Sequence, residues 1–363
     1  MRLSSLQLAD WRNIATAELD CDASFVVLHG ANAQGKTNLL EAVYALATLK
    51  SFRTRRNREL IRFGCGRAWV RGRIDDGHLV RELVLEVQPS SKRGFIDGKP
   101  PSKLREYFEG IRAVLFAPED VALVRGAPEL RRAFVDRAAF TASATFLEIA
   151  QIHKRLLDQR AALLRRFPVD RDQLAVFDTQ LAAAGARLVA RRRRLLSELA
   201  GPFTELHARI SGRGEATMSY RSCLPEVDGH EELAGAYLAA LERTRASSIE
   251  RGANLVGPQR DDLELCLDDK PARAFASQGQ TRSLVLALKL AELLAARARG
   301  ARPLFLLDDL SSELDRLRTG RLVQLLEELD LQCFVTTTEP DVVRAGTTVE
   351  VRAYEVEEGT VTC

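Results

Sequence analysis

The chain has 363 residues, 46% of them hydrophobic and 28% charged, and its formal net charge is only +3. This length suits two domains or one large domain with an insertion, and the composition leaves ample material for a core. The sequence has no apolar stretch long enough to span a membrane and no signal-peptide core, so we expect a cytoplasmic protein without a membrane partner. It also has no C-x-x-C pair, so we expect neither a disulfide framework nor a zinc site.

The first hundred residues have mainly β-type patterns. Strand-like runs cover residues 3–8, 15–19 and 25–29. Alternating segments at 68–74 and 79–87 flank a turn at 75–78, which predicts a hairpin. The apolar run at 112–116, stopped by Pro118, is typical of a buried strand.

Helix-forming residues then dominate from 119 to about 200. After a turn-rich stretch through Gly201, Gly212 and Gly214, the pattern predicts a helix at 231–250 and a strand at 263–267. A long helix at 280–297, an apolar strand at 304–307, a helix at 313–326 and a strand at 333–337 follow. This order predicts a mixed α/β sheet with a mainly helical lobe inserted into it.

Residues 30–37 match the complete phosphate-loop pattern G-x-x-x-x-G-K-[ST]. An apolar strand precedes them and a helix follows, so backbone N–H groups and a helix N-terminus would point at one place, as a triphosphate requires. Lys36 would reach the β and γ phosphates, and Thr37 would ligate Mg²⁺. A Gly-rich turn without a ligand is the alternative. The predicted nucleotide-binding residues here are Gly30, Ala31, Asn32, Ala33, Gln34, Gly35, Lys36 and Thr37.

Two carboxylates follow the apolar strand at 304–307. A buried parallel strand would bring Asp308 to the sheet edge that also carries the phosphate loop. Asp308 would then hold Mg²⁺ through water, and Asp309, one residue further out, would position or polarise the attacking water. With Lys36, these two are the predicted catalytic residues. The alternative is an acidic helix N-cap region.

Two further segments resemble motifs of ABC-type ATPases. Residues 308–315 (Asp-Asp-Leu-Ser-Ser-Glu-Leu-Asp) resemble the Walker B and D-loop run, in which the last four residues close on a partner's nucleotide. About thirty residues earlier, Ser277, Gln278, Gly279 and Gln280 precede a long helix, where these ATPases carry their signature motif. Ser277 can cap that helix and form a second anion site with its free N–H groups, although a plain helix cap is the alternative.

Among these ATPases the chain resembles most the RecF family of bacterial DNA-repair proteins, relatives of Rad50 and SMC heads. Many short motifs in the same order carry this resemblance. They are residues 8–13 (Leu-Ala-Asp-Trp-Arg-Asn), 30–41, 51–55 (Ser-Phe-Arg-Thr-Arg), 118–120 (Pro-Glu-Asp), 123–126 (Leu-Val-Arg-Gly), Pro128, Arg131, Arg132, 134–136 (Phe-Val-Asp), 257–262 (Gly-Pro-Gln-Arg-Asp-Asp), 277–280 and 307–315.

The resemblance implies an α/β ABC-type ATPase head without a long coiled coil. Lobe I would comprise residues 1–115 and 251–363, with a signature helix near 277–297, and the mainly helical lobe II residues 116–250. It also implies an ATP-dependent homodimer that sandwiches two ATP molecules, each bound by residues 30–37 and Asp308 of one subunit and by the Ser277 motif of the other. The closed dimer would bind duplex DNA, gapped DNA or a junction of single-stranded and double-stranded DNA. It would act in repair, replication restart and the SOS response, loading recombinase with RecR and RecO.

Two departures from transporter ATPases predict slow hydrolysis. Residues 336–338 (Thr-Thr-Thr) stand where transporters place a switch histidine, and Asp309 replaces their catalytic glutamate. We therefore expect at most a weak DNA-dependent ATPase. An ABC transporter subunit and a nucleotide-gated DNA clamp with negligible hydrolysis remain alternatives.

A basic stretch follows the phosphate-loop helix. Its cations are interleaved with Phe52 and Phe63, which suits a surface for DNA phosphates, and a solvated charged face is the alternative. The predicted DNA-binding residues are Arg53, Arg55, Arg56 and Arg58. The run of four arginines at 191–194 lies in a predicted helix and points around its circumference, so we expect it to be mostly solvated.

Overall fold

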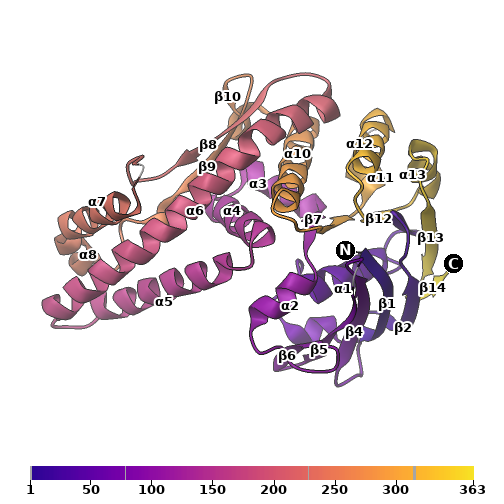
Figure 1. The fold of residues 1–363 in the computed structure, drawn as a ribbon, viewed down its shortest axis with the longest axis horizontal. Helices are drawn as coiled ribbons and strands as arrows, with labels where there is room; N and C mark the ends of the chain where they lie inside the picture. Colours follow the sequence, from indigo (N-terminus) through magenta and orange to yellow (C-terminus); the bar gives the residue numbers. More distant parts are fainter. Residues whose placement is uncertain (1, 78, 228, 314–315) are drawn as a thin grey trace. The chain divides into compact units, whose positions relative to one another are not determined.

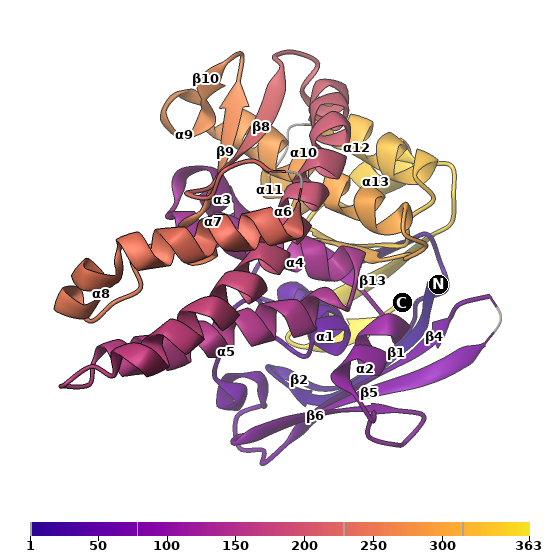
Figure 2. The ribbon, with the colours of Figure 1, turned by 60° about the vertical axis from the view of Figure 1, so that its left-hand side comes forward.

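The computed structural model describes residues 2–77, 79–227, 229–313 and 316–363. By its internal contacts the chain divides into two compact units. Unit 1 comprises Met1–Val121, Leu206–Arg213 and Ser277–Cys363, and unit 2 comprises Ala122–Glu205 and Gly214–Ala276. Their elements are labelled in Figure 1 and seen from another side in Figure 2.

Unit 1 contains a six-stranded sheet in the order β14-β13-β3-β12-β11-β7, in which the pairings from β13 to β7 are parallel and only β14 is antiparallel. Its strands are β3 (Phe25–His29), β7 (Ala113–Phe116), β11 (Leu304–Leu307), β12 (Cys333–Thr337), β13 (Val351–Glu357) and β14 (Thr360–Thr362). The four strands from β3 to β7 are nearly continuous buried runs, as expected for parallel strands covered on both faces.

A second sheet of unit 1 is antiparallel, with the order β2-β1-β4-β5-β6. Its strands are β1 (Arg2–Trp11), β2 (Ile14–Asp20), β4 (Ala68–Asp75), β5 (Val80–Gln88) and β6 (Ser91–Ile96). Buried and exposed residues alternate along β4, so one face of this sheet packs inward. Helix α1 (Lys36–Thr48) contacts strands of both sheets, and every residue from Leu39 to Ala47 is buried. The phosphate-loop helix is thus a core element (Figure 1).

The remaining helices of unit 1 are α2 (Leu104–Gly110), α10 (Gln278–Arg297), α11 (Leu310–Glu313), α12 (Arg316–Glu328) and α13 (Pro340–Gly346), with 3₁₀ turns at Asn57–Leu60 and Pro118–Val121. Helix α10 is almost entirely buried, and this includes Lys289. Lys289 Nζ donates to Asp120 Oδ1 over 3.0 Å, while Asp120 Oδ2 accepts from Ala117 N over 3.0 Å. Because a buried ammonium requires a paired charge, this contact ties α10 to the end of β7.

Unit 2 is mainly helical and carries a three-stranded sheet in the order β10-β9-β8. Its elements are α3 (Ala122–Arg125), α4 (Pro128–Ala142), α5 (Phe146–Leu164), the unit 2 part of α6 (Arg171–Ser211), β8 (Ala216–Arg221), α7 (His230–Arg243), α8 (Arg245–Arg251), a 3₁₀ turn (Pro258–Arg260), β9 (Asp262–Leu267), β10 (Lys270–Pro271) and α9 (Ala272–Phe275). Leu181, Val189, Tyr237 and Leu241 belong to its main buried cluster.

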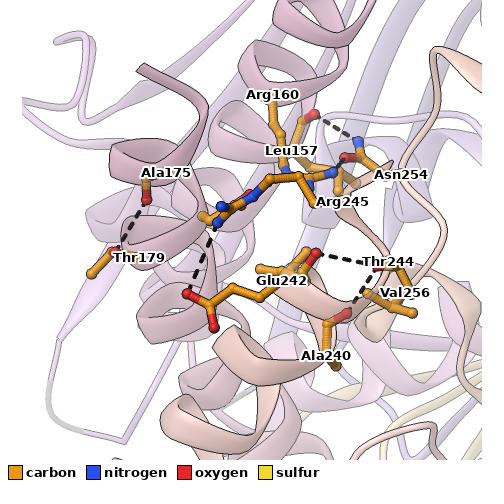
Figure 3. A network of polar contacts seen from close by, with 12 residues as sticks. Leu157, Arg160, Ala175, Thr179, Ala240, Glu242, Thr244, Arg245, Asn254 and Val256 are labelled. Atoms are coloured by element: carbon orange, nitrogen blue, oxygen red, sulfur yellow. Dashed lines mark hydrogen bonds and ion pairs between the residues drawn. The ribbon is translucent and has the colours of Figure 1, made fainter. Parts of the chain in front are cut away.

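A buried ionic network joins α5, α6 and α8 (Figure 3). Arg160 is fully buried; its Nε donates to Asp178 Oδ1 over 2.5 Å and its Nη1 to Asn254 Oδ1 over 2.7 Å. Arg245 donates to the other oxygen of Asp178 over 2.9 and 3.1 Å, and Asn254 Nδ2 donates to Leu157 O over 3.0 Å. Removing one partner would leave a buried charge uncompensated, so the network fixes the relative placement of the three helices.

A second network accounts for the arginine run at 191–194. Arg192 is buried and donates to both oxygens of Asp136 over 2.7 and 2.9 Å and to Pro258 O over 2.8 Å. Arg193 donates to the carbonyls of Leu224 and Pro225 over 2.7 and 2.8 Å. The prediction that this run is mostly solvated is therefore wrong for two of its four members, because acceptors on neighbouring elements of unit 2 receive them.

The segment before Ser277 is bound into unit 2. Arg131 donates to both oxygens of Asp262 over 2.6 and 2.8 Å, and β9 pairs with β8 along its length. Contacts thus group residues 251–276 with the helical unit, whereas the sequence expectation assigned them to lobe I. The expected fold class, a mixed α/β head with a parallel sheet, is confirmed. Of the helices in the described ranges, none is both long and apolar enough to cross a membrane.

The buried His153 on α5 makes stability depend on pH. Its side chain is 5% exposed, and burial, aided by Arg192 and opposed by Asp136, lowers its pKa from 6.5 to about 4. Below pH 6.5 the unfolded chain therefore takes up a proton that the folded chain excludes, and stability falls as the pH drops toward 4.

We predict that the wild type loses about 2 kcal/mol more unfolding free energy between about pH 7 and pH 5 than His153→Gln does, because the amide cannot be protonated there. Urea unfolding of both proteins at the two pH values measures the difference. An equal loss in both would show that His153 does not titrate between folded and unfolded states.

Candidate functional site

The phosphate-loop segment leaves β3 and enters α1 through two glycines in left-handed backbone conformations. Gly30 has φ of 137° and Gly35 has φ of 121°. A Cβ at Gly30 would lie 2.4 Å from Val356 O, and one at Gly35 would lie 2.9 Å from Asn13 Oδ1. Both positions therefore require glycine for conformation and for space.

Two carbonyl oxygens of the loop accept hydrogen bonds from its own lysine, and its amides are available. Lys36 Nζ donates to Gly30 O over 2.6 Å and to Ala31 O over 2.7 Å, which holds the ammonium across the loop. In the described part of the chain, no amide of residues 31–37 donates a hydrogen bond. Such amides at a helix N-terminus form an anion-binding nest, so the loop fits a phosphate chain. Burial lowers the pKa of Lys36, and Asp309 and Asp308 oppose that shift.

Asp308 lies at the end of β11, where the sequence places it, and is 5% exposed. Its Oδ1 accepts from Thr37 Oγ1 over 2.9 Å and from Thr336 Oγ1 over 2.7 Å. Burial raises its pKa, and these two hydrogen bonds partly oppose the rise. The structure thus brings the predicted metal residues Thr37 and Asp308 together. Among the described residues, no Lys, Arg or His forms an ion pair with Asp308. A hydroxyl beside such a buried carboxylate fits Mg²⁺, a hard cation that prefers oxygen ligands.

Asp309 adopts a left-handed backbone conformation with φ of 55°. Asp and Asn tolerate this conformation better than longer side chains, which gives a local reason for Asp in place of a catalytic glutamate. Its amide donates to Thr336 Oγ1 over 2.7 Å, so this threonine bridges both acidic residues. Thr336 begins the Thr-Thr-Thr run, and the sequence alone gave it no such role.

Ser277 is the N-cap of α10. Its Oγ accepts from Gln280 N over 3.3 Å, and Gln280 Oε1 accepts from Ser277 N over 2.8 Å, which completes a capping box. Ser277 and Gln278 are exposed. Gly279 packs closely against Arg318, because a Cβ at this position would lie only 2.9 Å from Arg318 Nη1. The cap is as expected from the sequence, and the motif's contact with a partner's ATP stays a prediction. Of the predicted D-loop, Leu314 and Asp315 lie outside the described residues.

A hairpin that sequence reasoning missed supports the phosphate loop. The amide of Gly359 donates to Gln34 O over 2.9 Å, and that of Glu358 donates to Gln34 Oε1 over 2.7 Å. These residues form the turn between β13 and β14, and β13 pairs with β3. The alternation of Tyr354 and Val356 with charged residues, followed by Glu-Gly, was the available signal.

A chain of side-chain amides connects the phosphate loop to the basic stretch. Asn13 Nδ2 donates to Gln34 O over 3.0 Å, and its Oδ1 accepts from Asn38 Nδ2 over 2.8 Å. Asn38 Oδ1 in turn accepts from Arg53 Nη1 over 2.7 Å. Asn38 follows Thr37 directly, so adjacent residues of α1 contact Asp308 and the basic stretch.

The buried Glu41 forms a second connection. Arg12 donates to both of its oxygens over 2.7 and 2.8 Å, and Ser51 Oγ donates to Oε1. Ser51 Oγ also accepts from the amides of Arg53 and Thr54, each over 2.9 Å. The motifs at residues 8–13 and 51–55 therefore anchor the basic stretch against the first turns of α1.

We define the basic segment as residues 50–67, which carry seven cations and the single acid Glu59. Three of the four arginines predicted to bind DNA make contacts within the chain. Arg53 donates to Asn38, and Arg58 donates to Cys65 O over 2.7 Å. Arg56 Nη1 lies 3.5 Å from Glu59 Oε1. Arg55 makes no hydrogen bond or ion pair to the described residues. All four are exposed.

The fold and this site define the class of protein. A phosphate loop and an acidic strand end meet at one edge of a parallel sheet, and residues 2–362 match the model of the RecF/RecN/SMC N-terminal domain. An SMC head bound to the C-winged helix domain of ScpA, 14% identical over 99% of this chain and 96% of that one, has a TM-score of 0.59, which supports the fold alone. The chain is an ABC-type ATPase head of this class.

The particular family follows from closer relatives. The chain is 40% identical to the DNA replication and repair protein RecF of Geobacter sulfurreducens over 100% of both chains, and 43% identical to that of Anaeromyxobacter sp. (strain Fw109-5) over 99% of both. The structure of the recombination mediator protein RecF with ATP, 27% identical over 99% of this chain and 98% of that one, has a TM-score of 0.88. The chain belongs to the RecF family.

The two carboxylates should respond differently to amide substitution. Burial raises the pKa of Asp308 above its ordinary value of 3.8. At a pH above 3.8 the charged carboxylate therefore destabilises the nucleotide-free folded state, and this destabilisation is relieved as the pH falls and the carboxylate is protonated. We predict that Asp308→Asn raises the urea midpoint of nucleotide-free protein at neutral pH and weakens the Mg²⁺ dependence of ATP binding.

Asp309→Asn should instead slow hydrolysis and leave binding of ATP with Mg²⁺ nearly intact. Unfolding curves, ATP titrations with and without Mg²⁺, and single-turnover hydrolysis measure the three effects. Identical behaviour of the two variants would contradict this division of roles.

Proposed function

We propose that the protein is an ATP-dependent DNA-binding protein of recombinational repair and replication restart. The observation that carries this proposal is the hydrogen-bond chain from Gln34 through Asn13 and Asn38 to Arg53, which links the phosphate loop to a dense cationic surface. Unit 1 would serve as lobe I of the head and unit 2 as lobe II. Action on bacterial chromosomal DNA would place the protein in the cytoplasm.

ATP would be held by the amides of residues 31–37 and by Lys36, with Mg²⁺ at Thr37 and Asp308. Thr37 and Asp308 would hold the cation, which would offset the buried charge of Asp308 and the negative charge of the phosphates. The free amides and the raised pKa of Asp308 support this assignment. ATP also accompanies the RecF relative of known structure.

Hydrolysis would be slow. Asp309 would orient the attacking water, but its carboxylate is one methylene shorter than the glutamate of transporter ATPases, and its backbone is held by Thr336. A nucleotide-gated clamp that hardly hydrolyses ATP is therefore the second candidate function. Single-turnover hydrolysis by purified protein, with and without DNA, separates the two.

The shared site would require two chains. We infer that Ser277 and the amides of Gln278 and Gly279 bind the γ phosphate held by a partner, because Ser277 and Gln278 are exposed at a helix N-terminus and the capping box uses the amides of Ser277 and Gln280 instead. Arg125 Nη2 donates to Ala276 O over 2.6 Å and so steadies the backbone just before Ser277. ATP would then favour the dimer, whereas ADP, which lacks that phosphate, would not.

The closed dimer would bind duplex or gapped DNA. Arg53, Arg55, Arg56 and Arg58 would contact its phosphates, which makes affinity fall steeply as salt rises. RecR and RecO would be the protein partners and recombinase loading the outcome. The RecFOR pathway named for the solved RecF relative supports this assignment.

The dimer tests the proposal. We predict that Ser277→Arg leaves ATP binding to one protomer almost unchanged, since Lys36 and Thr37 belong to another part of unit 1, but blocks ATP-induced dimerisation and nucleotide-dependent DNA binding. Light scattering with ATP and with ADP measures the mass of both proteins, and Ser277→Thr, which can still cap the helix, is the matched control. An ATP-induced dimer that survives Ser277→Arg would refute the shared site.

A further inference from the structure

Phe63 is an aromatic side chain displayed in solvent within the basic segment. It is 97% exposed, although aromatic rings of this size normally contribute to a core. Phe52, the other aromatic of the segment, packs edge-on against Tyr44 with ring centroids 5.5 Å apart. Of the two aromatics that the sequence places among the cations, only Phe63 is therefore available to a ligand.

The turn that carries Phe63 is anchored on both sides. Arg62 donates from its amide to Asp10 O over 2.7 Å and from Nε to Asp10 Oδ1 over 2.9 Å. Cys65 donates to the same Oδ1 over 3.2 Å, and its carbonyl accepts from Arg58 over 2.7 Å. Gly64, between them, has φ of 86°, a conformation that favours glycine. The ring is thus presented from a fixed backbone, which lowers the entropy that binding would cost.

The surroundings of Phe63 favour an anionic ligand with a flat apolar face. Arg62 is paired with the Asp10 carboxylate, but Arg58 holds the turn through a carbonyl and keeps its charge unpaired by that contact, and Arg55 and Arg67 make no hydrogen bond or ion pair within the described ranges. Glu59 is the only acid of the segment. Exposed aromatics combined with a cationic surface are how proteins bind single-stranded nucleic acid, since each base offers a face and each nucleotide a phosphate.

We propose that Phe63 stacks on an unpaired base where double-stranded DNA becomes single-stranded, while the arginines of the basic segment hold the flanking phosphates. This proposal rests on the proposed function and adds the residue that would contact the unpaired base. In an intact duplex the faces of the bases are covered by their neighbours, so Phe63 gains a contact only where a base is unpaired. The protein should therefore prefer a junction to a duplex of the same sequence.

The test compares Phe63→Ala with wild type on a duplex and on the same duplex with a single-stranded extension, both measured by fluorescence anisotropy with ATP. Loss of one stacking contact should weaken junction binding roughly tenfold and leave duplex binding unchanged. Phe63→Trp should retain the preference, and Phe63→Leu should lose it. In wild type, 2-aminopurine at the first unpaired position should be quenched by stacking, and in Phe63→Ala it should not.

Phe167→Ala is the matched control, because Phe167 is 99% exposed and follows Arg165 and Arg166 but belongs to unit 2. An equal loss of junction preference in this control would overturn the assignment. Unchanged junction binding in Phe63→Ala, or equal weakening on duplex and junction, would overturn it too, as would loss of RecR binding with DNA binding intact. Failure of wild type to bind any DNA would instead refute the proposed function.

Discussion

The structure depends on how one buried carboxylate is held. Asp308 is 271 residues from Thr37 in sequence, yet its Oδ1 accepts hydrogen bonds from the hydroxyls of Thr37 and Thr336. These bonds fix the start of α1 against the ends of β11 and β12. No cation of the described protein pairs with Asp308, and burial raises its pKa. This arrangement at the edge of the parallel sheet would suit a divalent cation and the phosphates that accompany it, and burial of the charge lowers the stability of the nucleotide-free protein.

The same first turn of α1 connects this node to the basic segment. Thr37 contacts Asp308, and its neighbour Asn38 accepts a hydrogen bond from Arg53. One turn later, buried Glu41 binds Arg12 and Ser51, so the chain leaving α1 is fixed to the residue that follows β1. A nucleotide that reorients the loop or the first turn of α1 would act on the cationic surface through these few contacts. Coupling between the two sites requires no long path, because they share adjacent residues of one helix.

Local patterns predicted the parts of the site that depend on local chemistry. The phosphate loop, the strand before Asp308 and the Ser277 cap are each read from a short run with a fixed backbone consequence. The supporting contacts were missed because they join distant segments: Asn13 with Gln34, Glu41 with Ser51, and Thr336 with both acidic residues. Strand β6 was missed because Lys92, Arg93 and Gly94 interrupt the alternation of apolar and polar residues that marks a strand. The helix-forming pattern was expected to end at about residue 200, but α6 continues through Pro202. Phe203 and Ile210 are buried there by packing that the sequence does not display.

Under the proposed function, occupancy of the phosphate loop sets the affinity of the chain for DNA. The most direct measurement is the dissociation constant for gapped DNA at fixed salt without nucleotide, with ADP and with ATP, for wild type and for Lys36→Ala. We expect tighter binding by wild type with ATP than in the other two states, and equal, weak binding by Lys36→Ala in all three. The same dissociation constant for wild type in every nucleotide state would contradict it.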